Sequence, residues 1–247
     1  MLNQLMRYLP LVSLLEKETC GRMLEVGSGI KGINRYLTEK MVIGVDVDFS
    51  GLCKADLRNF YPVKAEAIKL PFADNSIEIV VCSDTLEHVP QEDREAVIRE
   101  LWRVAQKKVY PSFPVKETYG AWERRLERIY TLFKKERPSW LIDHIDKGLP
   151  EKKRISKVLR DNMMPFKTLP NENNVIHFFL MIIDEFIFPC NLVADVMSPK
   201  QWNFGQHSFI ENLARCLLYG FRSLPLYLSF GSTVRKIFIL NKDEIYS

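Results

Sequence analysis

The chain has 247 residues, of which 47% are hydrophobic and 27% charged, so it is long enough to bury a core without disulfides or metals as staples. Its formal net charge of +4 is too small to indicate a nucleic-acid partner, and its five cysteines include no CxxC pair that would indicate a disulfide framework or a zinc site. No run reaches the roughly 18 apolar residues of a membrane span. The odd number of cysteines without a CxxC pair makes a reducing, cytoplasmic setting the expectation.

The first 18 residues predict an amphipathic helix rather than a signal peptide, because they contain Arg7 and Pro10, end in charged residues and lack an A-x-A cleavage pattern. Short apolar runs then alternate with helical patterns as far as residue 113, which is typical of βαβ units that build a parallel sheet. The expected strands are 22–26, 41–46, 61–65, 77–83 and 108–113. The expected helices in this part are 30–39 and 91–105.

The character of the sequence changes after Pro114. A charged, helical region follows at 115–161, and further strands are expected near 166–169 and at 234–240. The sequence therefore predicts an α/β fold: a Rossmann-like, seven-stranded, mostly parallel sheet with a helical insertion or cap.

Three parts are expected along the chain. Residues 1–114 form the N-terminal helix and the first part of the core, residues 115–230 form a mainly helical cap with a possible core strand near 166–169, and residues 231–247 form the final core strand and tail.

The cap contains two apolar stretches, 175–188 and 209–228, which we interpret as core or lid. The alternative is that they line an apolar channel for a ligand or contact a membrane surface. The basic residues Arg215, Arg222 and Arg235 are compatible with such docking.

A glycine-rich loop follows the first strand, where Gly27, Gly29 and Gly32 match the pattern G-x-G-x-x-G. Glycines let the backbone turn tightly and approach a ligand closely. Asp46 lies nineteen residues after Gly27, at the end of the second strand, where a carboxylate can accept both ribose hydroxyls. These features fit a nicotinamide cofactor as well as S-adenosylmethionine.

Glu25, two residues before the loop, favours S-adenosylmethionine over a nicotinamide cofactor. A carboxylate there would repel the pyrophosphate of a dinucleotide, whereas S-adenosylmethionine carries an ammonium and a sulfonium and no phosphate. The alternative is a solvated glutamate at the end of a strand.

Four segments in this order resemble the motifs of class I methyltransferases of the type-11 group. MLEVGSG (23–29) is similar to the first motif, GVDVD (44–48) to the second, and AEAIKLPFADNSIEIVVCSDTLEHVP (65–90) to the third and fourth. The resemblance covers roughly residues 20–114. It implies a Rossmann-like fold, S-adenosylmethionine as cofactor and methyl transfer as the reaction.

The resemblance also implies which residues hold the cofactor. These are Glu25, Gly27, Ser28, Gly29, Asp46, Val47, Glu66, Ala67, Ser83 and Asp84. The family often has Asp-Ala four residues before Leu-Pro-Phe, with the acid meeting the adenine amino group. This chain has Glu66-Ala67 there, which keeps the acceptor on a longer arm.

The tip of the fourth strand, residues 82–90, is expected to face the sulfonium and the methyl acceptor, because ligands bind at the carboxyl ends of strands in open α/β sheets. His88 is the candidate general base, since its unperturbed pKa lies near neutrality. The alternative is that Leu-Glu-His-Val caps the next helix and packs the loop.

Asp84, Glu87 and His88 at this tip are residue types that bind metals. A similar acid-x-x-Glu-His stretch occurs in ubiquinone-pathway O-methyltransferases, where a divalent cation is implied. The alternative is an acidic tip without an ion, and our prediction assigns no metal ligands.

Four further features are weighed outside the motifs. His144 is expected to be an exposed helix histidine, with a role in the acceptor pocket as the alternative. Tyr119 and Trp122 either line the acceptor site or pack the insertion, and the run 151–154 is a solvated helix start.

The function predicted from the sequence is S-adenosylmethionine-dependent O-methylation of a small or lipid-linked acceptor. The alternatives are a nicotinamide-dependent oxidoreductase and a non-catalytic homologue that binds S-adenosylmethionine. No nucleic-acid partner is expected, whereas peripheral contact with the inner face of a membrane fits a lipid-linked acceptor.

Overall fold

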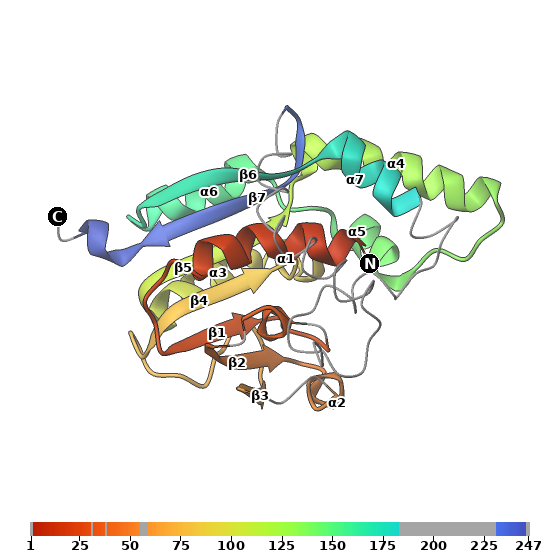
Figure 1. Cartoon of the computed structure of the whole chain (residues 1–247). Coiled ribbons are helices and arrows are strands. Elements are labelled where there is room, and N and C mark those ends of the chain that lie inside the picture. The colour runs from red at the N-terminus through yellow and green to blue at the C-terminus, as the bar shows by residue number, and fades with distance from the viewer. Residues whose placement is uncertain (1, 31, 38, 55–58, 183–230, 246–247) are drawn as a thin grey trace.

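Seven strands form one sheet in the computed structural model of the chain, which describes residues 2–30, 32–37, 39–54, 59–182 and 231–245 (Figure 1). The strands are β1 (Arg22–Val26), β2 (Met41–Asp46), β3 (Phe60–Lys64), β4 (Ile77–Ser83), β5 (Ala105–Pro114), β6 (Phe166–Asn173) and β7 (Thr233–Asn241). They lie side by side in the order β3-β2-β1-β4-β5-β7-β6. The predicted seven-stranded sheet is confirmed.

The sheet is mostly parallel, as expected. Neighbouring strands from β1 to β5 pair in parallel, whereas β7 runs antiparallel to both β5 and β6. The register aligns Val26 of β1 with Val45 of β2 and with Cys82 of β4. The loops that follow these three strands therefore leave from the same edge of the sheet, where ligands bind in this kind of fold.

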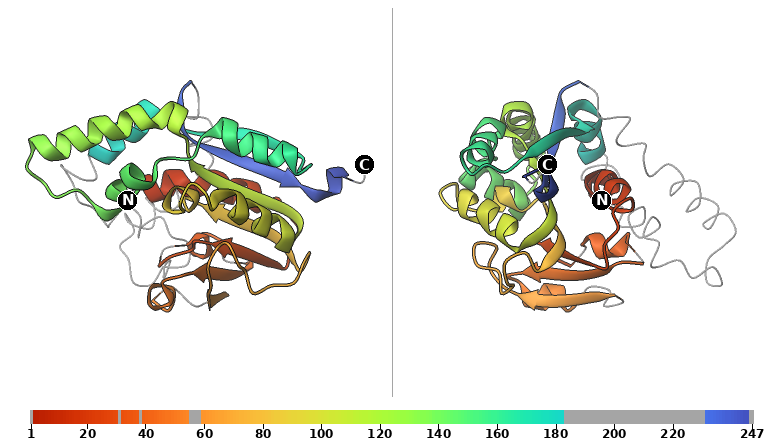
Figure 2. Two further views of the ribbon diagram at one scale, coloured as in Figure 1. Left: turned by 180° about the vertical axis from the view of Figure 1, so that it is seen from behind. Right: turned by 90° about the vertical axis from the view of Figure 1, so that its left-hand side faces the viewer.

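Helices cover both faces of the sheet (Figure 2). They are α1 (Leu2–Leu15), α2 (Phe49–Leu52), α3 (Arg94–Val104), α4 (Lys116–Leu132), α5 (Ser139–Lys147), α6 (Lys152–Asp161) and α7 (Asn174–Ile182), with 3-10 turns η1 (Ile33–Arg35), η2 (Leu86–His88) and η5 (Lys242–Ile245). No helix in the described part of the chain is long and apolar enough to cross a membrane.

Two hydrophobic layers hold the helices on the sheet. On one face Leu11 and Leu15 of α1 pack with Val81 of β4. On the opposite face α3 and α6 contribute Leu101 and Leu159 to a second layer. Successive β4 side chains enter both layers, which is why this strand has no polar face.

The helix expected at 30–39 is wrong. The structure has only η1 in the described part of this stretch. Gly32 is extended, with φ −76° and ψ −179°, and the backbone N–H of Ile33 donates to the carboxylate of Glu25. The apolar residues do have helical spacing, but the glycine loop extends to Gly32, and the first helical turn begins only at Ile33.

A third, smaller core lies beyond the carboxyl ends of the parallel strands (Figure 1). It joins Leu126 and Tyr130 of α4, Leu141 of α5 and Met181 of α7. Within the predicted cap, α6 and β6 instead belong to the layers of the main sheet.

Part of the predicted cap lies outside the described residues. This holds for 183–188 of the first apolar stretch, for the whole of 209–228, and for Arg215 and Arg222.

Candidate active site

The glycine loop after β1 has the backbone that its sequence predicts. Gly27 and Gly29 have φ values of +74° and +55°, in the left-handed region that favours glycine. A Cβ atom at Gly27 would lie 2.0 Å from Oγ1 of Thr85, whereas one at Gly29 would meet nothing within 4 Å. Gly27 therefore allows the loop to pass directly against the tip of β4.

The Glu25 carboxylate accepts hydrogen bonds from both ends of this loop. Its side chain is fully buried, Oε2 accepts hydrogen bonds from Ser28 Oγ at 2.7 Å and from the Ile33 N–H at 2.9 Å, and burial raises its pKa. The interpretation of Glu25 as a solvated residue is wrong. The carboxylate fixes the two ends of the loop, so that the backbone between them keeps one shape.

Asp46 stands at the end of β2, opposite the loop. Its Oδ2 accepts a hydrogen bond from the Gly29 N–H at 3.0 Å and its Oδ1 accepts one from the Asp48 N–H at 3.0 Å. Each carboxylate oxygen keeps further lone pairs for a ligand. The side chain is thus held in place and still able to accept hydrogen bonds.

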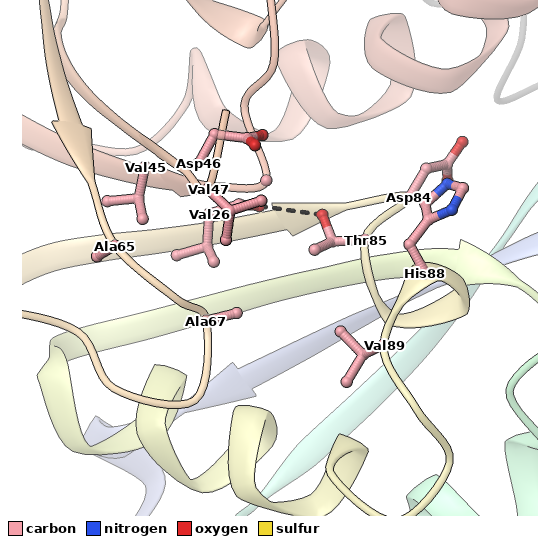
Figure 3. Close-up of a pocket in the computed structure, with 11 residues that line it drawn as sticks. Val26, Val45, Asp46, Val47, Ala65, Ala67, Asp84, Thr85, His88 and Val89 are labelled. Carbon is pink, nitrogen blue, oxygen red and sulfur yellow. Dashed lines mark hydrogen bonds between the residues drawn. The ribbon is translucent and has the colours of Figure 1, made fainter. Parts of the chain in front are cut away.

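A cavity of about 310 Å³ lies between these loops, within the range of small-molecule sites (Figure 3). Its lining residues come from the ends of β1, β2, β3 and β4: Val26, Gly27, Val45, Asp46, Val47, Ala65, Ala67, Asp84, Thr85, His88 and Val89. Two carboxylates and no Lys or Arg are among them. Arg235 and Arg7 offset the charge of Asp84, so Asp46 is the carboxylate that can attract a cationic ligand.

The structure brings together six of the predicted site residues around this cavity: Gly27, Asp46, Val47, Ala67, Asp84 and His88. The remaining five do not line it. Glu25, Ser28 and Gly29 shape the loop, Ser83 is buried beneath Arg7, and Glu66 is exposed between Ala65 and Ala67.

A buried ion pair fixes the tip of β4. The Arg235 guanidinium on β7 donates to both oxygens of Asp84 at 2.8–2.9 Å, and Arg7 of α1 approaches Asp84 Oδ2 to 3.6 Å. Burial alone would raise the pKa of Asp84, but these two cations outweigh it and hold the pKa at about 2. Arg235 also binds Glu172, so it is buried and paired rather than free to dock on a membrane, which corrects that expectation.

A second cavity of about 220 Å³ lies on the other side of this tip. Its lining is mainly charged, imidazole and aromatic: Arg7, Asp84, Glu87, His88, Pro114, Tyr119, Trp140, His144, His177, Met181 and Arg235. Asp84 and His88 line both cavities. The two spaces therefore meet at the residues that follow β4.

His88 is half-buried where the cavities meet. Its Nδ1 lies 3.2 Å from Asp143 Oδ2, while burial, followed by the charge of His144, lowers its pKa. Its neighbour Glu87 is 1% exposed, and burial together with the charge of Asp84 raises the pKa of Glu87 to about 8. A lowered pKa keeps the imidazole neutral near pH 7, which is the form that accepts a proton.

His144 is not the exposed helix residue that the sequence predicts. It is 8% exposed, its Nδ1 lies 2.6 Å from Glu123 Oε1, and its ring centroid is 5.0 Å from that of His88. The reason is that α5 packs against η2, which turns His144 toward the strand-four tip. Tyr119 lines the second cavity, whereas Trp122 packs against Phe178.

The sequence motifs give no sign of several residues of the second cavity. Arg7 and Arg235 are separated from Asp84 by 77 and 151 positions along the chain, and His177 pairs with Tyr119 Oη at 2.9 Å. The one available signal is a polar side chain, His177, within the apolar run VIHFFLMI.

One part of the chain, residues 24–110, is similar to a known family of proteins. The architecture is that of the Rossmann-like α/β class, and residues 24–110 match the family model described as a methyltransferase domain. Residues 24–110 are therefore similar to a methyltransferase domain.

Two similar curated proteins are named demethylmenaquinone methyltransferase. The one from Roseiflexus sp. (strain RS-1) is 34% identical and the one from Roseiflexus castenholzii 31% identical, each over 103 residues. The match covers 38% of this chain and 42% of each relative. The chain therefore aligns with less than half the length of the curated relatives.

Solved structures share the fold at low identity. Magnesium protoporphyrin IX methyltransferase from Synechocystis, solved with bound SAH, has a TM-score of 0.54 at 19% identity, over 70% of this chain and 79% of that one. A SAM-dependent methyltransferase from Archaeoglobus fulgidus has a TM-score of 0.52 at 13% identity, over 94% of this chain and 93% of that one.

The close approach at Gly27 predicts a difference between two glycine variants. Alanine at either Gly27 or Gly29 should lower the free energy of unfolding by about 1 kcal/mol, because both positions have a left-handed backbone. Gly27→Ala should lower it by about 1–3 kcal/mol more, because the new Cβ must displace Thr85. Urea denaturation measures both. Adding Thr85→Ala to Gly27→Ala should recover part of the extra loss. Equal losses for the two glycine variants would contradict the contact.

The Asp84 ion pair predicts a pH-dependent stability. A folded pKa of about 2, below an unfolded value of about 3.9, gives a stabilising contribution that is present above the unfolded pKa and is lost as the pH falls through the folded one. From about pH 5 to about pH 3 the contribution should fall by about 1 kcal/mol.

The stability of the parent is compared with that of Asp84→Asn, because an asparagine at this position has no carboxyl group to titrate. Denaturation of both proteins should therefore show the stability gap narrowing as the pH falls over this range. A gap that stays constant would mean that the Asp84 carboxylate has an ordinary pKa.

Proposed function

We propose that the chain is an S-adenosylmethionine-dependent methyltransferase that methylates a hydroxyl group on a small or lipid-linked acceptor. The observation that carries this proposal is the pair of cavities at the β4 tip, which share Asp84 and His88. One cavity contains Asp46 and no Lys or Arg, and the other is lined by the imidazoles of His88, His144 and His177. Such a pair suits a donor and an acceptor that must meet at one wall.

The first cavity fits S-adenosylmethionine by the chemistry of its donors. Asp46 is fixed by backbone hydrogen bonds and can accept the ribose hydroxyls, while Gly27 lets the chain pass close to the ligand. Apolar walls from Val45, Ala65 and Ala67 suit a flat adenine. Glu66, exposed between Ala65 and Ala67, is the proposed acceptor for the adenine amino group. When bound, S-adenosylmethionine supplies a methyl group on a positively charged sulfur.

The same lining argues against the nicotinamide alternative. The pyrophosphate of a dinucleotide needs positive charge or free backbone N–H groups at the glycine loop. Here the N–H groups of Gly27 and Ser28 both donate to Val45 O, and that of Gly29 donates to Asp46. The loop therefore offers its backbone donors to the protein rather than to a phosphate.

His88 is proposed to take the proton of the acceptor hydroxyl. It lines both cavities, and Asp143 holds its Nδ1, which leaves Nε2 as the second ring nitrogen. Asp84 is bound by Arg235 and serves to position the tip rather than to accept a proton. A base at the shared wall lies next to both the methyl donor and the acceptor.

The acceptor is proposed only as a class. The polar lining of the second cavity supports an acceptor whose reacting end carries a hydroxyl. The names of the two Roseiflexus relatives support a quinone-like ring as the acceptor, although they do not support a hydroxyl as the methylated group. A lipid tail and peripheral membrane contact remain predictions, because most of the apolar cap segment lies outside the described residues.

Asp46→Ala is expected to weaken S-adenosylmethionine binding by about 1.5–3 kcal/mol, the scale of a charge-assisted hydrogen bond. Isothermal titration calorimetry measures this, with Asp48→Ala as the matched control, because Asp48 caps α2 and does not line the cavity. NAD should show no binding to the parent chain. Binding of NAD without binding of S-adenosylmethionine would overturn the proposed cofactor.

His88→Ala is expected to lower turnover by about 10²–10⁴-fold while cofactor affinity stays nearly unchanged. The acceptor is first identified by mass spectrometry of products formed from labelled cofactor and extracts split into polar and lipid fractions. Asp143→Asn should cause a smaller loss, since it only holds the ring. Equal turnover in parent and His88→Ala would return His88 to a structural role, and no product from any fraction would favour the non-catalytic alternative.

A further inference from the structure

Three potential metal ligands converge on the wall of the second cavity. Glu87 and His88 follow one another on η2, and His144 comes from α5, which packs against this turn. One ligand atom from each lies within 4.8 Å of the other two. His144 lies outside residues 24–110, so the cluster is not contained in the shared methyltransferase domain.

Two of the three side chains are buried with a polar atom left unpaired. Glu87 is 1% exposed and His144 8% exposed. Among the described residues, Glu87 Oε2 and His144 Nε2 have no hydrogen-bond partner. Glu87 Oε1 and His144 Nε2 face each other at 4.0 Å, which is too far for a hydrogen bond. Buried polar groups without partners destabilise a fold, and a shared cation between them would remove that penalty.

In both imidazoles the Nδ1 atom lies next to a carboxylate. His88 Nδ1 lies 3.2 Å from Asp143 and His144 Nδ1 lies 2.6 Å from Glu123. In each ring this leaves Nε2 for the cluster. A carboxylate that orients an imidazole whose other nitrogen binds a metal is the usual supporting arrangement of histidine metal sites. The nearby Asp84 does not compete, because Arg235 occupies it.

The donor set selects the kind of ion. Two imidazoles and one carboxylate suit Zn²⁺, Mn²⁺, Fe²⁺ or Co²⁺ better than Mg²⁺ or Ca²⁺, which prefer oxygen. Donors held at about 2.1 Å in a tetrahedral site lie about 3.4 Å apart, so the three side chains must draw together by about an ångström. Three protein ligands leave a coordination position open, as in catalytic sites.

We propose that Glu87, His88 and His144 bind one divalent transition-metal ion, whose open position faces the second cavity and takes an oxygen of the acceptor. The role toward the acceptor rests on the proposed function, whereas ion binding itself does not. With the ion bound, His88 would ligate the metal, and the proton of the acceptor hydroxyl would leave to water because the ion would lower the pKa of the bound hydroxyl. His88 would act as the base only in the ion-free chain. His144 takes no part in the proposed proton transfer, so a His144 variant tests the metal site without removing that base.

Metal titration of the full chain tests the assignment. The protein is stripped with a chelator and titrated with Zn²⁺ by calorimetry and with Co²⁺ by visible absorption. One ion per chain should bind, without the thiolate charge-transfer band that cysteine ligation would give. Mg²⁺ should bind at least about tenfold more weakly than Zn²⁺.

Matched variants locate the ion. Glu87→Gln and His144→Ala should each weaken Zn²⁺ binding by more than about 100-fold, and Glu123→Gln, which only orients His144, should weaken it by about 10–100-fold. Cys53→Ser controls for the exposed thiol and should bind as the parent does. Thermal unfolding followed by circular dichroism verifies that each variant is folded. His144→Gln replaces His144→Ala if the latter unfolds.

The outcomes separate this inference from the proposed function. Absence of Zn²⁺ binding, equal affinity in the parent and the folded His144 variant, or loss of binding in Cys53→Ser would each overturn the metal site. Binding of S-adenosylhomocysteine is measured in parallel. Its failure would overturn the proposed function and leave the metal assignment standing.

Discussion

The buried ion pair between Asp84 and Arg235 is the interaction on which the arrangement of both cavities depends. A buried charge without a partner is strongly destabilising, so each group requires the other. Arg235 also binds Glu172, and Arg7 approaches from α1. Four elements, α1, β4, β6 and β7, are thereby tied at one point. The turn that follows Asp84 carries Glu87 and His88, and its position is set by this network.

The two cavities are built by different means. The first is formed by loops at the ends of parallel strands, and its shape comes from backbone geometry: the positive φ of Gly27, the contact with Thr85 and the buried carboxylate of Glu25. The second is formed by side chains from α1, α4, α5, α7 and β7 around the same tip. The shape of the first cavity therefore depends on the backbone of the loops, and that of the second on side chains from separate helices.

Local sequence patterns were sufficient for the core strands and for the glycine loop. Buried strands such as 77–83 stand out because the run is short and rich in β-branched residues, which distinguishes it from a buried helix segment. The helix expected at 30–39 failed because a tertiary contact, from Glu25 to the Ile33 N–H, outweighed the apolar spacing. The burial of His144 and the pairing of Asp84 with Arg235, 151 positions away, depend on how distant elements pack, and no local pattern carries that information.

If S-adenosylmethionine binds in the cavity at the ends of β1, β2 and β4, its demethylated product should protect the backbone there. Hydrogen–deuterium exchange with and without S-adenosylhomocysteine tests this most directly. Backbone amides in 26–29, 45–47 and 84–89 are expected to exchange more slowly with the ligand, with little change in α4 and α5. Slower exchange confined to α4 and α5, or no change at the three strand ends under saturating ligand, would contradict it.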